Sequence, residues 1–481
     1  MKKTVVLYPA LAVSHFVPMM QLADVLLDAG YAVVVALIDP ADKEDVAFAA
    51  VVRRVAASKP LVAFHKLPRI EDPPTVIHDA QFILRYLDLV SRYNKLLHGF
   101  LCAMPLGSVQ AVVVDAFSSG ALDVAKKLGI PAYSFYATNA STVAVFLQLP
   151  TICREDQPSF RELGDTPLNF HGVPPMPASH LVEEVLRDPE SEVYKVMMDG
   201  FRRIPEAVDG ILVNTFTSLE TRAVEALGDL RLRHLPATPP VYYVGPLLAG
   251  AGKEKEKHEC LSWLDEQPER SVVYLCFGSI GTGNHSREQL NEIAVGLENS
   301  GHRFLWVVRA PPSDDPERPS DHRTDPDLDE LLPDGFLDRI NGRGLILKLW
   351  APQVEVLHHK ATGAFVTHCG WNSVLEGIRA CVPMLCWPLY AEQKMNKVFM
   401  VEEAGIGVEV AGWQQGLVKA GEVEAKVRMV LESEEGERLR AQVTALSKAA
   451  AAAWEDGGSS RVAFQRFMSD AEKLKAQAMR A

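Results

Sequence analysis

The sequence predicts an α/β protein with two doubly wound parallel sheets, and three observations lead to that prediction. Short apolar runs rich in Val, Ile, Phe and Tyr alternate with stretches of helical periodicity. The runs are continuously apolar, as in strands that are buried on both faces of a parallel sheet. A segment rich in Pro and Gly interrupts the alternation, which then starts again, and this indicates two sheets in tandem, each flanked by helices.

The first half of the chain carries six expected strands with helical stretches between them. The helical stretch 17–30 ends at Gly30, a residue suited to the left-handed conformation that closes many helices. The expected strands are 4–9, 31–38, 61–67, 111–117, 132–137 and 210–216.

The second half repeats the pattern after residues 235–259, whose Pro, Gly and charged residues favour an interdomain linker. The expected strands there are 271–277, 303–308, 344–350, 363–368 and 383–388. Residues 310–330, rich in Pro and acidic residues, predict an exposed loop. We therefore expect an N-terminal domain (1–245), a linker (246–262), a C-terminal domain (263–457) and a last helix (458–481) that packs back on the N-terminal domain.

The composition excludes some classes of partner. Lys and Arg number 49 against 62 Asp and Glu, a net charge of −13 without a basic block, which disfavours binding to nucleic acid or anionic membranes. We find no apolar stretch of about 18 residues that would predict a membrane span. The seven scattered cysteines fit buried free thiols in a reducing compartment, so we expect a cytoplasmic protein. As a separate expectation, the protein is a monomer.

A cluster of polar residues follows the expected strand 363–368. The strand ends at His368, and Gly370 allows the backbone to approach a ligand closely before Asn372 and Ser373 open a helix. Ligands of open α/β sheets bind at the carboxyl ends of the strands, and a helix N-terminus attracts anions. The natural ligand of this cluster is a phosphate or a pyrophosphate.

Helix capping is the alternative interpretation of the same residues. Ser373 and Glu376 have the S-x-x-E spacing of a capping box. Capping alone leaves His368, Gly370 and Trp371 unexplained.

A wider window carries a family resemblance. The 44 residues from Trp350 to Gln393 resemble the signature box of the plant family-1 UDP-sugar glycosyltransferases, with W-A-P-Q at the start, H-C-G-W-N-S in the centre and E-Q at the end. The resemblance extends over the chain through a first strand that leads to a His, a V-D-x-F stretch and an F-G-S turn. The segments "VVLYPALAVSHFVPMMQLADVLL" and "PLYAEQKMN" are most similar to the flavonoid and phenylpropanoid branch.

The resemblance implies the GT-B fold, in which two Rossmann-like domains face each other, with the UDP-sugar donor in the C-terminal domain and the acceptor in the N-terminal one. Trp350 would stack on uracil, and Glu376 would accept from the ribose hydroxyls. The other implied donor contacts are Ala351 and Gln353 to the base or ribose; His368, Gly370, Asn372, Ser373 and Ser279 to the diphosphate; and Trp371, Glu392 and Gln393 to the sugar.

Two residues outside the signature box are candidates for catalysis. His15 follows the first strand, and Asp115 ends another strand, so both lie at carboxyl ends. An Asp that accepts from an imidazole fixes its tautomer and supports its cation, although each residue alone could simply be a polar strand-end group. The resemblance implies that His15 is the general base and Asp115 its partner. The acceptor hydroxyl would attack the anomeric carbon in one inverting step as UDP leaves.

The chain departs from the family pattern at two places. Ala12-Val13-Ser14 precedes His15 where relatives often have Gly-x-Gly, which bears on the shape of that loop. Ala137 stands where relatives often have a Thr whose hydroxyl can reach the sugar's 6-hydroxyl. Thr138 would not replace it if both were strand residues, because neighbouring strand residues point to opposite faces. Gln393 favours glucose, since relatives that use galactose often carry His there.

The expected function is that of a UDP-glucose-dependent O-glucosyltransferase acting on small phenolic acceptors, with flavonoids as the expected class. Transfer to carbon or nitrogen, or to another small aglycone such as a phenylpropanoid, hormone, terpenoid or xenobiotic, stays open. A non-catalytic binding protein of the same fold is disfavoured by the presence of both His15 and Asp115. An NAD-dependent oxidoreductase is disfavoured because no G-x-G-x-x-G follows the first strand.

We expect neither a metal nor a cofactor besides the donor. His358, His359, His368 and Cys369 invite comparison with a zinc site. Adjacent histidines point apart, however, and no C-x-x-C or H-x-x-x-H pair completes a tetrahedron.

Overall fold

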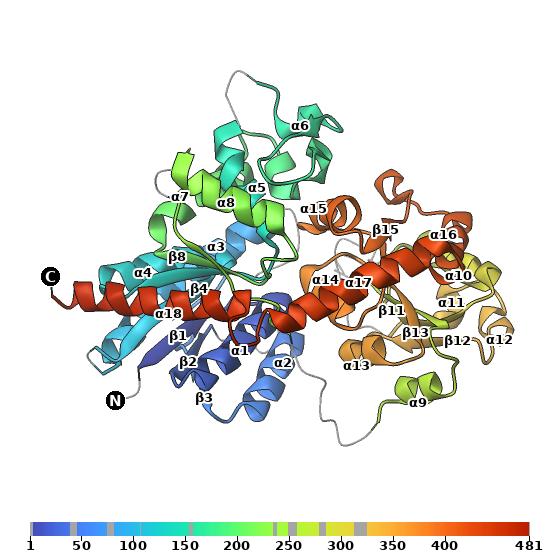
Figure 1. Cartoon of the computed structure of the whole chain (residues 1–481), viewed down its shortest axis with the longest axis horizontal. Coiled ribbons are helices and arrows are strands. Elements are labelled where there is room, and N and C mark those ends of the chain that lie inside the picture. Colours follow the sequence, from blue (N-terminus) through green and yellow to red (C-terminus); the bar gives the residue numbers. More distant parts are fainter. Residues whose placement is uncertain are drawn as a thin grey trace. The chain divides into compact units, whose positions relative to one another are not determined.

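The computed structural model describes residues 3–38, 46–74, 81–105, 107–152, 157–233, 238–248, 257–278, 285–311 and 325–480. The chain forms two compact units (Figure 1). The N-terminal unit comprises Met1–Ser179, Glu183–Leu248 and Ala451–Ala481, and the C-terminal unit comprises His180–Val182 and Ala249–Ala450.

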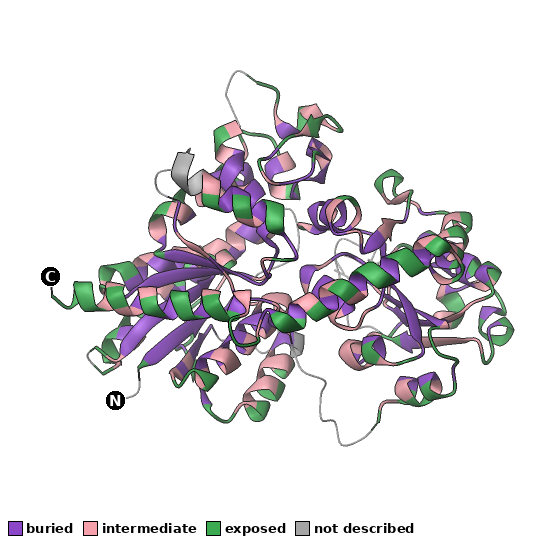
Figure 2. Ribbon diagram, viewed as in Figure 1, coloured by how far each residue is buried: buried purple, intermediate pink, exposed green. Residues whose placement is uncertain are grey.

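The N-terminal unit is built on a seven-stranded sheet of order β3-β2-β1-β4-β5-β8-β9, in which all neighbours are parallel. Its strands are β1 (Thr4–Tyr8), β2 (Ala32–Leu37), β3 (Val62–Lys66), β4 (Val109–Asp115), β5 (Ala132–Tyr136), β8 (Gly210–Val213) and β9 (Val241–Tyr243). The central strands β1, β4 and β5 are buried along their whole length, as their apolar sequences require (Figure 2).

Helices cover this sheet, and a short antiparallel hairpin lies outside it. The helices are α1 (Val13–Asp28), α2 (Val46–Ser58), α3 (Phe82–Ala103), α4 (Leu122–Lys127), α5 (Ala140–Ile152), α6 (Phe160–Leu163), α7 (Glu192–Ala207), α8 (Thr221–Arg233) and α18 (Ser459–Ala478), with a 3₁₀ turn η1 (Ala116–Ala121) after β4. The hairpin pairs β6 (Pro167–Leu168) with β7 (Met176–Pro177).

Helix α18 packs in the N-terminal unit although it ends the sequence. Phe464, Phe467 and Met468 are buried in one apolar cluster with residues of β1, β2, β4 and β5. The Tyr242 hydroxyl of β9 donates to an Asp470 carboxylate oxygen at 2.9 Å. The last helix therefore completes the core of the unit that the first strand begins.

The C-terminal unit is built on a six-stranded parallel sheet of order β12-β11-β10-β13-β14-β15. Its strands are β10 (Val272–Cys276), β11 (Arg303–Val308), β12 (Gly344–Lys348), β13 (Thr362–Thr367), β14 (Met384–Cys386) and β15 (Gly407–Glu409). The helices are α9 (Glu259–Asp265), α10 (Arg287–Ser300), α11 (Leu328–Leu331), α12 (Phe336–Arg339), α13 (Gln353–His358), α14 (Trp371–Arg379), α15 (Gln393–Val398), α16 (Ala420–Glu432) and α17 (Glu434–Ala452).

Both sheets have a switch point where the strand order reverses. It lies between β1 and β4 in the N-terminal unit and between β10 and β13 in the C-terminal unit. The connections that follow these strands leave in opposite directions, so a crevice opens at their carboxyl ends. The expectation of two doubly wound parallel sheets is confirmed, and it directs attention to these four strand ends.

Three details differ from the sequence-based expectations. β9 lies within residues 235–259, where we expected only a linker, because Val241–Tyr243 is a short apolar run that adds an edge strand to β8. The three-residue strand β15 was not expected, since so short a run gives no periodic signal. The expected loop 310–330 lies largely outside the described residues, and its described end already contains the start of α11 at Leu328.

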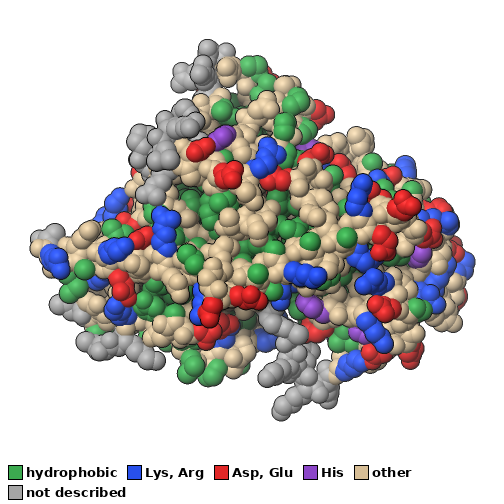
Figure 3. Space-filling model, viewed as in Figure 1, with side chains coloured by type: hydrophobic (Ala, Val, Ile, Leu, Met, Phe, Trp, Pro, Cys, Tyr) green, Lys and Arg blue, Asp and Glu red, His purple; other side chains and the backbone are tan. Residues whose placement is uncertain are grey.

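The surface mixes both signs of charge. On the face shown in Figure 3, Lys and Arg side chains are interspersed with Asp and Glu side chains. Among the described residues, no helix is both long enough and apolar enough to cross a membrane.

Candidate active site

His15 and Asp115 meet at the switch point of the N-terminal sheet. His15 lies in the first turn of α1, the helix that follows β1, and Asp115 is the last residue of the adjacent strand β4. The His15 Nδ1 atom lies 3.0 Å from an Asp115 carboxylate oxygen. Because Nδ1 faces the carboxylate, Nε2 is the nitrogen that can accept a proton from a substrate.

The surroundings of this pair hold the carboxylate firmly. Asp115 is fully buried, and its second oxygen accepts from the Phe117 backbone N–H at 2.9 Å. The His15 side chain is 22% exposed, and its ring packs edge-on against Phe117 with a centroid separation of 4.9 Å. The pair thus combines a fixed carboxylate with an imidazole that a ligand can reach.

His368 lies at the switch point of the C-terminal sheet. It directly follows β13, whose Thr367 is paired in register with Cys276 of β10. Burial and the positive charge of Arg309 lower the pKa of His368 to about 4, so the ring is neutral at pH 7. Its Nδ1 atom is buried and has no hydrogen-bond partner among the described residues.

Two glycines make room for the His368 ring. A Cβ atom on Gly278, where φ is +90°, would lie 2.7 Å from Nε2, and one on Gly370 would lie 2.5 Å from the same atom. Both distances are shorter than real contacts allow. We expected Gly370 to admit a ligand, and the structure shows that it first admits the imidazole.

The N-terminus of α14 is not capped by Ser373 and Glu376. The N-cap residue is Gly370, and no described side chain caps the helix there. The N–H groups of the first helical turn, which begins at Trp371, point out of the N-terminal end of the helix, where its dipole is positive. The capping-box alternative is therefore wrong, and the N-terminus keeps its capacity to bind an anion.

Ser373 and Glu376 belong to a different network. The Gln353 amide nitrogen donates to the Ser373 hydroxyl at 3.0 Å and to a Glu376 carboxylate oxygen at 2.7 Å. The Tyr274 hydroxyl lies 3.4 Å from the Gln353 amide oxygen. Burial raises the pKa of Glu376 to about 7, against the opposing effect of the Gln353 hydrogen bond. Three residues with expected roles at the nucleoside or diphosphate are thus in contact.

The Trp350 side chain, three positions before Gln353 in the sequence, is partly exposed. It is 46% exposed, and the preceding Leu349 has a φ of +67°, which turns the chain sharply after β12. The His258 ring packs edge-on against it at 5.8 Å. Ala351, next in sequence, is buried. A half-exposed indole on a fixed turn can stack on a base.

The sugar-binding candidates Glu392 and Gln393 lie at the start of α15. Gln393 is 3% exposed, and its amide oxygen accepts from the backbone N–H groups of Leu389 and Tyr390 at 2.9 and 3.0 Å. Both lone pairs of that oxygen are therefore engaged, and only the amide nitrogen is left for a sugar hydroxyl. In this arrangement Gln393 can therefore offer a sugar hydroxyl a donor and not an acceptor.

Trp371 does not offer its side chain to a ligand. The indole is 2% exposed and packs edge-on against Phe399 at 5.9 Å. Any contact of Trp371 with a sugar must therefore involve its backbone N–H at the N-terminus of α14. Asn372, the next residue, is partly buried in the same turn. Ser279 lies outside the described residues.

Sequence reasoning missed Asn396 and Arg309. Asn396 is fully buried on α15, and its amide nitrogen donates to the Cys369 carbonyl at 2.9 Å and approaches a Glu392 carboxylate oxygen at 3.4 Å. Asn396 therefore links α15 to Cys369, the residue between His368 and Gly370, whose φ is +65°. The only sequence signal for a role of Asn396 was its position three residues after Gln393, which places the two side chains on the same face of a helix. Arg309, directly after β11, was detectable as a cation at a strand end.

The loop after β5 corrects one assumption about Ala137 and Thr138. β5 ends at Tyr136, so both residues lie beyond the strand and strand alternation does not decide where their side chains point. The Thr138 hydroxyl is buried without a hydrogen-bond partner among the described residues. Ala137 has no hydroxyl to bind the sugar's 6-hydroxyl. The Thr138 hydroxyl is therefore a candidate for that contact.

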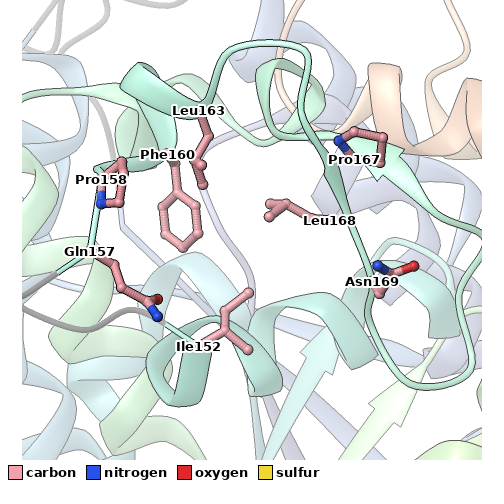
Figure 4. Close-up of a pocket in the computed structure, with 8 residues that line it drawn as sticks. All are labelled: Ile152, Gln157, Pro158, Phe160, Leu163, Pro167, Leu168 and Asn169. Carbon is pink, nitrogen blue, oxygen red and sulfur yellow. The ribbon is translucent and has the colours of Figure 1, made fainter.

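A cavity of about 310 Å³ lies elsewhere in the N-terminal unit (Figure 4). It is lined by Ile152, Gln157, Pro158, Phe160, Leu163, Pro167, Leu168 and Asn169. Ile152 is the last residue of α5, about 18 Å along the helix from its start after β5. None of the residues that we expected at the active site lines this cavity.

No described group of three or more His, Cys, Asp and Glu side chains is arranged to hold a metal ion. His359 instead lies 3.1 Å from an Asp265 carboxylate oxygen, and His358 faces the Val354 carbonyl at 2.9 Å.

A His–Asp pair on one doubly wound sheet and candidate nucleotide-binding residues on another are the parts that a transferase of nucleotide-activated groups requires. Comparison with known proteins makes the class specific. Residues 217–438 match the family model described as "UDP-glucoronosyl and UDP-glucosyl transferase". The chain is 40% identical to UDP-glycosyltransferase 88B1 of Stevia rebaudiana, covering 96% of this chain and 97% of that one. It is 39% identical to an anthocyanidin 5,3-O-glucosyltransferase of a Rosa hybrid cultivar, covering 95% and 96%.

A solved structure agrees with these matches. Phytolacca americana UGT2, complexed with UDP-2-fluoro-glucose and pterostilbene, superposes with a TM-score of 0.83 at 32% identity, covering 98% of this chain and 99% of that one. The chain belongs to the UDP-glycosyltransferase family and is a glycosyl-transferring enzyme of the GT-B fold. The resemblance inferred from the signature box is confirmed.

Proposed function

We propose that this enzyme transfers glucose from UDP-glucose to a hydroxyl group of a small phenolic acceptor, with inversion at the anomeric carbon. The observation that carries the proposal is the 3.0 Å contact of His15 with the buried Asp115 at a sheet switch point. A non-catalytic binding protein has no need of such a pair. The rose relative, named for anthocyanidin glucosylation, supports flavonoids as the acceptor class.

In the proposed reaction, His15 Nε2 removes the proton from the acceptor hydroxyl as its oxygen attacks the anomeric carbon. The Asp115 carboxylate stabilises the imidazolium that forms. The bond between the anomeric carbon and the diphosphate oxygen breaks on the opposite side, and UDP departs with the electron pair. A single displacement of this kind inverts the configuration of the sugar.

The departing diphosphate gains negative charge, which the C-terminal unit is suited to stabilise. The candidate groups are the N–H groups at the start of α14 and the neutral donor His368. Arg309 adds a positive charge near His368. We propose that these groups replace a divalent cation, so transfer should persist in the presence of EDTA.

A panel of phenolic acceptors incubated with UDP-glucose tests the proposal, with products identified by mass spectrometry and the anomeric proton coupling measured by NMR. We expect β-O-glucosides from the α-linked donor. Products linked through carbon or nitrogen would contradict transfer to oxygen. Products with the retained α configuration would contradict inversion.

A further inference from the structure

Tyr86 joins the two chain segments that carry His15 and Asp115. It projects from α3, which contributes no residue to the family signature, and it is 4% exposed. The Leu11 backbone N–H donates to the Tyr86 hydroxyl at 3.3 Å, and the Ser118 hydroxyl lies 3.2 Å from the same oxygen. Leu11 precedes the first turn of α1, and Ser118 lies in η1 directly after β4.

The His15 segment needs an anchor of this kind. The N-cap residue of α1 is Ala12, and no described side chain caps the helix there. A hydrogen bond at Leu11 therefore fixes the approach to His15 at a point where the helix start has no cap of its own.

Aromatic packing reinforces the link. The Phe117 ring lies edge-on to Tyr86 at 6.4 Å and edge-on to His15 at 4.9 Å. The Phe117 backbone N–H also holds Asp115. Burial and the Asp115 charge raise the pKa of Tyr86 well above its usual value, so the phenol keeps its proton and remains a hydrogen-bond donor at neutral pH.

We propose that Tyr86 is a positioning residue for catalysis, whose hydroxyl sets the orientation of His15 relative to Asp115 by bridging Leu11 and Ser118. The inference rests on the proposed function of His15 as general base. Tyr86 touches neither reacting group, and it acts through the two segments that it joins.

The test compares Tyr86→Phe with Tyr242→Phe, which also removes a buried tyrosine hydrogen bond in the N-terminal unit but at Asp470. Each is assayed with a weakly acidic alcohol and with 4-nitrophenol as acceptors. For Tyr86→Phe we expect kcat to fall roughly tenfold with the alcohol at an unchanged KM for UDP-glucose. The loss should shrink to about twofold with 4-nitrophenol, whose proton leaves more readily. Tyr242→Phe should keep kcat with both acceptors.

Two results would overturn the inference: wild-type kcat with the alcohol, or an equal loss with both acceptors. His15→Ala, measured in parallel, separates this inference from the proposal beneath it. If His15→Ala is inactive while Tyr86→Phe matches the wild type, only the positioning role fails. If His15→Ala keeps its turnover, the base itself is wrong. Should Tyr86→Phe fold poorly, Ser118→Ala removes the other partner and must show the same dependence on acceptor acidity.

Discussion

At the scale of single residues, ionisation states decide what the donor site can do. His368 is neutral at pH 7 because burial and Arg309 disfavour its cation. Glu376 is balanced between its two forms because burial raises its pKa to about 7. A protonated carboxyl can accept fewer hydrogen bonds from a ribose diol than a carboxylate can.

Donor affinity should therefore rise with pH. Glu376 is mostly protonated at pH 6 and mostly ionised at pH 8, so we expect UDP-glucose to bind up to about tenfold more tightly at pH 8. UDP-glucose is the right probe because its diphosphate, unlike that of UDP, does not titrate in this range. Calorimetry should show the dependence in the wild type and not in Glu376→Gln. The same pH dependence in both proteins would show that another group is responsible.

A second prediction at the scale of single residues concerns Ala137, Thr138 and the preference for UDP-glucose over UDP-xylose. If no hydroxyl now holds the sugar's 6-hydroxyl, Ala137→Thr should raise the ratio of kcat/KM for UDP-glucose over UDP-xylose several-fold, which corresponds to about 0.5–1.5 kcal/mol for one hydrogen bond. An unchanged or lower ratio would contradict this. Thr138→Val then shows whether the buried Thr138 hydroxyl already makes that bond, because the ratio would fall in this variant.

At the scale of elements, the donor site depends on how α14 and α15 are joined. The Asn396 amide of α15 holds the Cys369 carbonyl just before α14 begins, and Gln393 closes the turn before α15. The sequence predicted the strand, the glycine and the helix of this region, because each has a local signal. It could not predict the bond from Asn396 to Cys369, since that bond joins residues 27 positions apart.

Removal of this link should weaken donor binding. Asn396→Leu leaves the buried Cys369 carbonyl without its donor, which should lower the free energy of unfolding by about 1–3 kcal/mol. Because the turn before α14 then loses its link to α15, we expect the Kd for UDP-glucose to rise by about fivefold or more, up to the roughly hundredfold that would follow if the whole cost had to be met on binding. Asn291→Leu is the matched control, because Asn291 donates to the Arg287 carbonyl on an exposed helix surface. If both variants bind UDP-glucose like the wild type, the link does not support the site.

At the scale of the whole molecule, the two units contain different parts of the candidate site. The His15–Asp115 pair lies in the N-terminal unit, and the candidate donor-binding residues lie in the C-terminal unit. The sequence was sufficient for the two parallel sheets, since buried strands are continuously apolar. It was also sufficient for His15 and Asp115, since Asp115 ends a strand and His15 lies in the segment that follows the first strand. It was insufficient for β9 and β15, which are too short to show periodicity, and for Tyr86, whose role arises only when α3 packs beside η1. Candidate functional residues at strand ends can be predicted from the sequence. The residues on other elements that hold them in place cannot, because their contacts form only on folding.

The turnover of His15→Ala, determined together with its affinity for UDP-glucose, is the decisive test of His15 as the general base. The base lies in the N-terminal unit, and the donor candidates lie in the C-terminal unit. We therefore predict that kcat with a weakly acidic acceptor falls on the order of 10²–10⁴-fold while the Kd for UDP-glucose is unchanged. Near-normal turnover of that acceptor, or a loss explained by weaker donor binding alone, would contradict the assignment of His15 as the general base.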